Sequence, residues 1–466
     1  MPEIISPIDG RPAYHFDLLS HDEVGARLQL AAATSRGWRD SALDERIALC
    51  RGMLAAYESH AVEFAEQITR MMGKPIRQAR AEFAGTMVER VEALCDMAPE
   101  ALADAVLPEK KGFQRFIRHE PVGVVLDIAA WNYPLAIAVN VIVPAVLAGN
   151  AVLVKHASQT ALVADQFERC FLEAGAPEGL VQAMPMDHAT TARLIKSRSL
   201  GFVSFTGSVR GGHEIYRAVA EDNFIQAGME LGGKDPALVL EDADVAFAAE
   251  NLVDGAFYNA GQSCCGIERI YVADSLFDDF VAAYVELAKQ YTLGDPLDEA
   301  TSLGPLVDEK STDFVRDQVS AAIDAGADLL VGDHDFDLPT GSRCYLAPQV
   351  LVGVDHSMAL MHEETFGPAI GIQRVANEAE GLALMNDSDF GLTASIWSGD
   401  QERASRLAED VEAGTVFTNR CDYLDPGLAW TGVKDSGFGC SLSTLGFQSV
   451  TRPKSYHLRE EPERPT

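Results

Sequence analysis

The sequence predicts an α/β fold in which parallel strands alternate with helices on both faces of a sheet. From residue 122 onward, short apolar runs alternate with amphipathic segments, and the strongest candidate strands are 122–130, 151–155, 201–205 and 236–240. Strands that are apolar throughout and separated by helices are typical of a parallel, doubly wound sheet. The chain has 466 residues, which is too long for one ordinary core, so two or three domains are expected.

The elements outside this alternation can be justified in chain order. Residues 41–75 place apolar side chains at helical spacing, and Gly-Lys-Pro ends the run. The apolar segment 135–149 is shorter than the ~20 residues of a membrane span and contains Asn140 and Pro144, so a buried helix is expected. Residues 112–121 alternate large and charged side chains and are predicted to form an exposed strand. The tail, 447–458, is predicted to form a final strand.

The composition excludes several classes of protein. Against 70 acidic residues there are 37 Lys and Arg, giving a net charge of −33, and such a field repels nucleic acid. The eight cysteines are scattered without a CxxC pair, which indicates a reducing cytoplasm. Residues 1–20 have no apolar stretch of the kind found in secretory signals, and no membrane partner is expected. The 11 histidines form no HExxH-like set, so no metal site is expected.

Residues that could carry chemistry follow the predicted strands, where ligands bind in parallel sheets. Asn132 is either an amide donor for an oxyanion or the cap of a turn. Lys155 is either a contact for ribose or phosphate or a lysine that extends into water. The stretch 205–212 is either an anion site at a helix N-terminus or a plain Gly-rich turn. Glu230 is either a general base with a raised pKa or a solvated carboxylate.

Two adjacent cysteines, Cys264 and Cys265, lie in "FYNAGQSCCGIER". Neighbouring side chains point in different directions, so the two sulfurs are not expected to share one task.

Taken in order, these motifs resemble the aldehyde dehydrogenase superfamily, over essentially the whole chain. "MELGGKDP" is followed at the family's spacing by the cysteine of "GQSC". The stretches "WNYP", "KHASQT", "FTGSVRGG", "EETFGP" and "GVKDSGFG" occur in the family's order. In length and in its "KHAS" element the chain resembles the short succinate-semialdehyde dehydrogenase-like members.

The resemblance implies a role for each matching residue. Cys264 matches the nucleophile, Glu230 the general base, and Asn132 with the backbone N–H of Cys264 the oxyanion hole. Glu364 matches the residue that holds the nicotinamide ribose, and Phe366 the one beside its ring. The implied cofactor-binding residues are Trp131, Lys155, Ser158, Gly207, Ser208, Gly212, Leu231, Glu364 and Phe366. The implied substrate pocket contains Tyr133, Asn140, Tyr258 and Cys265.

The implied reaction is NAD(P)-dependent oxidation of a small aldehyde to a carboxylic acid. It passes through a cysteine thiohemiacetal, hydride transfer to the nicotinamide, and hydrolysis of a thioester. A CoA-acylating dehydrogenase is disfavoured, because it would need no water-activating base such as Glu230. A relative kept only as a structural or binding protein is disfavoured by the intact Cys264, Glu230 and Asn132.

The resemblance also implies how the chain is divided. A Rossmann-like cofactor domain is expected from residues 1–102 and 122–231, and a catalytic domain from 232–446. Segments 103–121 and 447–466 are expected to form a small β extension that joins subunits in a homodimer or homotetramer.

Three departures from the family pattern refine these expectations. Ser158 stands where many NAD-preferring members have a glutamate, so NADP is admissible and use of both cofactors is expected. Asn140 and Tyr258 stand where succinate-semialdehyde dehydrogenases commonly place arginines. An uncharged aldehyde is therefore expected to be at least as good a substrate as succinic semialdehyde. Cys440 and Ser441 replace a second glutamate, so any proton relay must use other groups or water.

Overall fold

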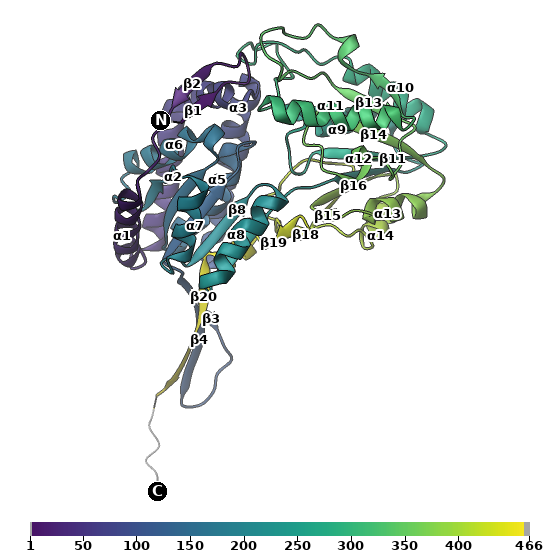
Figure 1. The fold of residues 1–466 in the computed structure, drawn as a ribbon. Helices are drawn as coiled ribbons and strands as arrows, with labels where there is room; N and C mark the ends of the chain where they lie inside the picture. Colours follow the sequence, from purple (N-terminus) through teal and green to yellow (C-terminus); the bar gives the residue numbers. More distant parts are fainter. Residues whose placement is uncertain (1, 461–466) are drawn as a thin grey trace.

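The computed structural model describes residues 2–460 and consists of two α/β lobes and a projecting arm (Figure 1). The first lobe is built on a six-stranded sheet, the second on a seven-stranded sheet, and the arm is a three-stranded sheet. The α/β class with two parallel, doubly wound sheets and a β extension is as predicted. Within residues 2–460, no helix has both the length and the apolarity needed to cross a membrane.

The first lobe orders its strands β19-β9-β8-β5-β6-β7, all parallel except the short β19. Every residue of β5 and β6 is buried, as the apolar runs predicted. The strands are β5 (Val124–Ala129), β6 (Ala151–His156), β7 (Val181–Ala183), β8 (Phe202–Thr206), β9 (Gln226–Glu230) and β19 (Gly437–Phe438). The helices are α1 (His21–Trp38), α2 (Leu43–Met72), α3 (Ile76–Ala81), η1 (Glu82–Met87), α4 (Val88–Ala101), α5 (Pro134–Ala148), η2 (Ser158–Thr160), α6 (Leu162–Glu173), α7 (His188–Lys196), α8 (Val209–Asp222) and α15 (Ser443–Ser449).

The second lobe orders its strands β12-β13-β14-β11-β10-β16-β17, and only the edge strand β12 is antiparallel. Alternate residues of β10 enter two separate apolar cores: Ala237 and Val239 on one face, Leu238 on the other. The strands are β10 (Asp235–Val239), β11 (Ile267–Ala273), β12 (Asp328–Val331), β13 (Gln349–Val352), β14 (Ala369–Val375), β16 (Thr393–Trp397) and β17 (Thr415–Thr418). The helices are α9 (Val245–Phe257), η3 (Tyr258–Gly261), α10 (Phe277–Ala288), α11 (Glu309–Asp324), η4 (Asp333–Asp335), α12 (Ala359–His362), α13 (Glu378–Asn386) and α14 (Gln401–Ala408). Two small pairs, β1 (Glu3–Ile5) with β2 (Pro12–His15) and β15 (Phe390–Gly391) with β18 (Val433–Lys434), complete the strands.

The arm joins segments from both ends of the chain. Strand β20 (Thr451–Arg459) pairs antiparallel with the whole of β4 (Phe113–Pro121), and β3 (Ala105–Val106) lies on the other side of β4. The ring of Phe116 stacks on that of Tyr456, with centroids 4.5 Å apart. The predicted strand at 112–121 is therefore present.

The tail differs from its prediction at one end. Residues up to Ser449 belong to helix α15, and the strand begins only at Thr451. Phe447 is buried in the first lobe, so packing against that core decides the helical state of a segment whose sequence alone favoured a strand. Residues 461–466 of the predicted extension 447–466 lie outside the described residues.

Glu230 lies on a strand that was not among the predicted ones. Glu230 is the last residue of β9, a strand with the sequence QAGME that has no apolar alternation to predict it. The predicted strand at 236–240 is β10, which belongs to the second sheet, so the chain crosses between lobes over Leu231–Lys234. Glu230 thus ends the first sheet at the point where the second begins.

Candidate active site

The polar residues that follow the first-lobe strands lie along one edge of one sheet. The neighbouring strands β9, β8, β5 and β6 are parallel, so their carboxyl ends meet at that edge. Glu230 ends β9, Gly207 and Ser208 follow β8, Asn132 follows β5 and Lys155 lies near the end of β6. This is the arrangement in which doubly wound sheets bind ligands.

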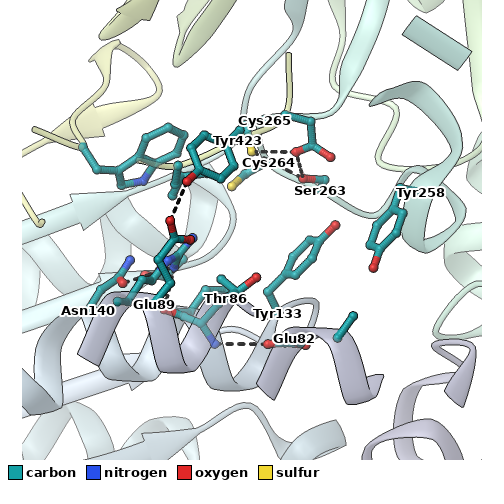
Figure 2. Close-up of a pocket in the computed structure, with 18 of the residues that line it drawn as sticks. Glu82, Thr86, Glu89, Tyr133, Asn140, Tyr258, Ser263, Cys264, Cys265 and Tyr423 are labelled. Carbon is teal, nitrogen blue, oxygen red and sulfur yellow. Dashed lines mark hydrogen bonds between the residues drawn. The ribbon is translucent and has the colours of Figure 1, made fainter. Parts of the chain in front are cut away.

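A cavity of about 240 Å³ lies against this edge, between the two lobes (Figure 2). Cys264 and Glu230 both line it, as do all four residues of the predicted substrate pocket: Tyr133, Asn140, Tyr258 and Cys265. Asn132 is buried beside the cavity without lining it. We call this space the central cavity.

The two cysteines have different surroundings. Cys264 is half-buried and Cys265 is buried. Interaction with the Cys264 thiol, together with burial, raises the pKa of Cys265 well above its ordinary value. The Sγ atom of Cys265 donates a hydrogen bond of 3.1 Å to Oδ1 of Asp422, which also accepts from Ser263 Oγ. Cys265 is therefore a protonated, hydrogen-bonded thiol, and Cys264 is the less buried of the two sulfurs.

The backbone before Cys264 is held in an uncommon conformation. Asn259, Ala260 and Gly261 have φ values of 54°, 56° and 70°, in the left-handed region that costs a non-glycine residue about 1–2 kcal/mol. Asn259 Nδ2 donates to the backbone oxygens of Asn132 and Gln262. Gln262 Oε1 accepts from the N–H of Val307 at 2.8 Å. Hydrogen bonds from both lobes thus hold the turn that presents Cys264.

The amide of Asn132 lies close to that turn. Its Nδ2 donates to the backbone oxygen of Gln262 at 3.1 Å, two residues before Cys264. A primary amide has a second N–H, so Asn132 can still donate to an oxygen formed near the sulfur.

Glu230 is bound by two hydroxyl groups. Ser441 Oγ donates to its Oε1 at 2.5 Å, and Thr206 Oγ1 lies 3.5 Å from its Oε2. Burial raises the pKa of Glu230, while the Ser441 hydrogen bond and the charge of Arg90 oppose that rise. The sequence showed Ser441 only as the replacement of a glutamate, but the structure makes it the direct partner of Glu230.

The N-terminus of α8 is rich in glycine and closely packed. Ser208 caps the helix by accepting from the N–H of Gly211 at 3.2 Å. A Cβ on Gly207 would lie 2.8 Å from the Phe205 ring, and one on Gly212 would lie 2.7 Å from Leu231. The N–H groups of a helix N-terminus suit an anion such as the pyrophosphate of a dinucleotide.

Two further cofactor candidates lie near the end of β6. Lys155 is buried, and burial lowers its pKa. Ser158 begins the short helix η2 and lines a separate hollow with Met186 and His188.

Glu364 contacts the backbone where the chain crosses between the lobes. Its Oε1 accepts from the N–H of Gly233 at 3.0 Å, and burial raises its pKa to about 7. A Cβ on Gly232 would lie 2.4 Å from both carboxylate oxygens, so only glycine permits this approach. Phe366 meets Trp131 edge to face, with centroids 5.7 Å apart.

A buried ion pair fixes the loop that carries Glu364 and Phe366. Glu268 accepts from the N–H groups of Thr365 and Phe366, both at 2.8 Å. Lys234 donates to Glu268 at 2.8 Å and to Thr365 Oγ1 at 2.9 Å. Sequence reasoning missed Glu268, although it lies within the stretch "FYNAGQSCCGIER", because no local pattern pairs it with Lys234 or with residues 364–366.

Sequence reasoning also missed a group of cavity residues from the N-terminal helices and from the loop after β17. They are Glu82, Glu89, Arg90, Asp422 and Tyr423, and Figure 2 shows several of them around the cysteines. The N-terminal residues lie in an amphipathic pattern, in which charged positions normally face water. No signal in the sequence separates these positions from a solvated helix face.

Comparison with known proteins agrees with this geometry. The family model described as "Aldehyde dehydrogenase family" matches residues 2–456. A succinate semialdehyde dehydrogenase [NAD(P)+] of Escherichia coli K12 is 36% identical over 447 residues, covering 95% of this chain and 94% of that protein. An aldehyde dehydrogenase of Paenarthrobacter nicotinovorans is 34% identical, covering 97% of this chain and 98% of that protein.

Solved structures share the fold over nearly the whole chain. The succinic semialdehyde dehydrogenase of Streptococcus pyogenes, determined in complex with NADP+, superposes with a TM-score of 0.93 at 30% identity. The superposition covers 98% of this chain and 99% of that one.

Proposed function

The chain belongs to the aldehyde dehydrogenase family, and we propose that Cys264, Glu230 and Asn132 carry its NAD(P)-dependent oxidation of an aldehyde to a carboxylic acid. The observation that supports these roles best is the central cavity, where Cys264 and Glu230 line one space of about 240 Å³. A nucleophile and a base that share a small cavity can act on the same carbon atom.

Each residue has a role that follows from its contacts. The Cys264 thiolate adds to the aldehyde carbon, and Asn132 Nδ2 with the backbone N–H of Cys264 donates to the oxygen that becomes negative. When bound, the nicotinamide cofactor supplies the acceptor for the two electrons and the hydrogen lost from that carbon. The Glu230 carboxylate then takes a proton from the water that hydrolyses the thioester. Water is the natural acceptor of the acyl group here, because a carboxylate next to the cavity has no comparable use in acyl transfer to CoA.

The cofactor site fits either dinucleotide. The α8 N-terminus offers backbone N–H groups for a pyrophosphate, and Lys155 lies near the end of β6, which β5 separates from β8 in the same sheet. Ser158 places no carboxylate at the position from which it would repel a 2′-phosphate. The Escherichia coli relative carries NAD(P)+ in its name, and the Streptococcus pyogenes structure holds NADP+. Use of both NADP and NAD is therefore proposed for this chain.

The substrate is proposed to be a small aldehyde, and two classes compete. Tyr133 and Tyr258 give the cavity aromatic walls that suit an uncharged aldehyde. The names of the relatives instead point to succinic semialdehyde, which carries a carboxylate.

The arm is proposed to join subunits into a homodimer or homotetramer. Its outer strands β3 and β20 each have an unpaired edge, and Val106 is 79% exposed. Exposed apolar strand edges pair readily with a second chain. A cytoplasmic location is proposed because all eight cysteines are free thiols.

Substitution of each cysteine tests the catalytic assignment. Cys264→Ser should lower turnover at least 1,000-fold, because a serine hydroxyl at its ordinary pKa is a poor nucleophile. Cys265→Ser should keep most of the activity, because a hydroxyl can still donate to Asp422. The measurement is NAD(P)H absorbance over an aldehyde panel with both cofactors. Full turnover by Cys264→Ser, with loss in Cys265→Ser, would overturn the assignment.

A further inference from the structure

One cation lines the central cavity and has no acidic partner in contact with it. Arg90, on helix α4, is 5% exposed and lines the same space as Cys264 and Glu230. Its Nη1 donates to the backbone oxygen of Ala136 at 2.8 Å and to Asn140 Oδ1 at 3.1 Å. Its Nε has no hydrogen-bond partner, and Arg90 forms no salt bridge within residues 2–460.

A buried guanidinium without a carboxylate partner is energetically unfavourable unless a bound anion pairs with it. Buried arginines are normally paired with a carboxylate, because an unpaired buried charge costs several kcal/mol. Burial lowers the pKa of Arg90, but a guanidinium remains protonated in proteins. A buried guanidinium with unused N–H groups, next to a cavity, is a ready-made binding group for a carboxylate.

The acidic residues around the cavity are engaged elsewhere. Glu82 is bound by Lys74 and by backbone N–H groups, and Glu89 accepts from the hydroxyl of Tyr423 at 2.6 Å. Asp422 accepts from Ser263 and Cys265, and Glu230 accepts from Ser441. Asp254, the remaining acid of the lining, is exposed. The negative charge of Glu230 reaches Arg90 only through space.

Asn140 explains why the sequence alone indicated a substrate pocket without a cation. In the sequence, Asn140 stands on helix α5 at a position where succinate-semialdehyde dehydrogenases commonly have an arginine. In the structure, its side-chain oxygen accepts from a cation on helix α4, and the same guanidinium reaches the α5 backbone at Ala136. The positive charge is therefore present in the cavity, although it comes from a different helix.

We propose that Arg90 binds the carboxylate of the substrate, and that the substrate class is a short aldehyde acid, the semialdehyde of a dicarboxylic acid. The inference rests on the proposed function, since it assigns the substrate of the same cavity. Asn140 is the positioning residue that orients the guanidinium. The expectation that an uncharged aldehyde serves equally well is replaced by a preference for the acid.

The test compares two substrates of equal carbon number, succinic semialdehyde and butanal, in the wild type and in Arg90→Met. The ratio of kcat/KM for the acid to kcat/KM for butanal should fall about 10- to 150-fold in the variant, the range for a lost hydrogen bond to a charged group. Arg90→Lys keeps the charge but not the planar guanidinium, so its ratio should lie between those of the wild type and Arg90→Met. Arg77→Met provides the matched control, because Arg77 is an exposed arginine on α3 outside the cavity lining, and its ratio should not change.

A binding measurement separates this inference from the proposed function. Succinate should raise the melting temperature of the wild-type enzyme and of Arg77→Met, but not that of Arg90→Met. If butanal is oxidised by the wild type while succinate binding and the ratio are insensitive to Arg90, the carboxylate site is wrong and the dehydrogenase assignment stands. An equal fall in kcat/KM for succinic semialdehyde and for butanal, in both Arg90→Met and Arg90→Lys, would also overturn the inference. Should Arg90→Met fail to fold, Asn140→Ala must lower the ratio in its place.

Discussion

At the scale of single residues, Glu230 is a base whose strength depends on one neighbouring hydroxyl. Burial raises its pKa, and the hydrogen bond from Ser441 is the largest influence acting against that rise. The Ser441 Oγ atom donates to Glu230 Oε1 over only 2.5 Å. A serine therefore stands where a second carboxylate would have repelled Glu230 and raised its pKa further.

Replacing Ser441 by alanine should make Glu230 harder to ionise. A hydrogen bond to a charged group contributes about 1.5–3 kcal/mol, so the pKa of Glu230 should rise by about one unit or more. Since the carboxylate form is the base, activity should fall most at low pH and recover as pH rises. The measurement is the pH dependence of kcat, with Ser441→Thr as the variant that keeps the hydroxyl. An acid limb that stays in place in Ser441→Ala would contradict the role of this contact.

At the scale of elements, helix α5 depends on a carboxylate from a different helix. Glu82 Oε1 accepts from the N–H groups of Leu135 and Ala136 in the first turn of α5. Its Oε2 accepts from Lys74, which also lies 4.1 Å from the centre of the Tyr133 ring. A negative charge at a helix N-terminus is stabilising, and here it fixes the turn that carries Asn132.

Breaking this pair should destabilise the first lobe. Both side chains are buried, so Lys74→Met leaves an unpaired carboxylate and should cost about 3–5 kcal/mol. The exposed pair Arg217–Glu214 supplies the control, since Arg217→Met should cost no more than about 1 kcal/mol. Thermal unfolding of the two variants measures the difference. Equal melting temperatures would show that the buried pair contributes nothing.

The elements also show which features a sequence can predict. Strands β5, β6 and β8 were predictable because they are mostly buried and mostly apolar, and the residues after them carry motifs. Strand β9 was not, because a short strand containing Gly and Gln is stabilised by its neighbour β8 rather than by its own pattern. Arg90 was not predictable as a cavity residue, since only tertiary packing separates it from the solvated positions of an amphipathic helix. Nor could any local pattern pair Ser441 with Glu230.

At the scale of the whole molecule, the lobes are packed around apolar cores of their own, whereas the arm is not. Both lobes have closed apolar cores, whereas the arm projects away from them with its strand edges unpaired (Figure 1). Leu458 is 45% exposed near the end of β20. An isolated sheet of this size is marginally stable on its own, so a second subunit is its expected support.

Charges placed on the arm should therefore change the assembly. Val106→Lys with Leu458→Asp should shift the protein from an oligomer toward a monomer, because charged edges resist pairing with another strand. Light scattering after size-exclusion chromatography gives the mass directly. Leu428→Asp, on an exposed leucine away from the arm, is the control and should leave the mass unchanged. A monomeric wild type would refute the proposed role of the arm.

The turn before Cys264 has a consequence for how this sequence can diverge. Asn259 accepts no substitute easily, because its side-chain Nδ2 donates to the backbone oxygens of Asn132, in the first lobe, and of Gln262. Gln78 in turn donates to the backbone of Ser302 in the second lobe. Loss of the Asn259 or the Gln78 side chain leaves backbone groups of both lobes without their partners. Sequence drift at Gln78 and Asn259 is thus restrained by backbone groups of the opposite lobe, so both side chains are expected to be retained.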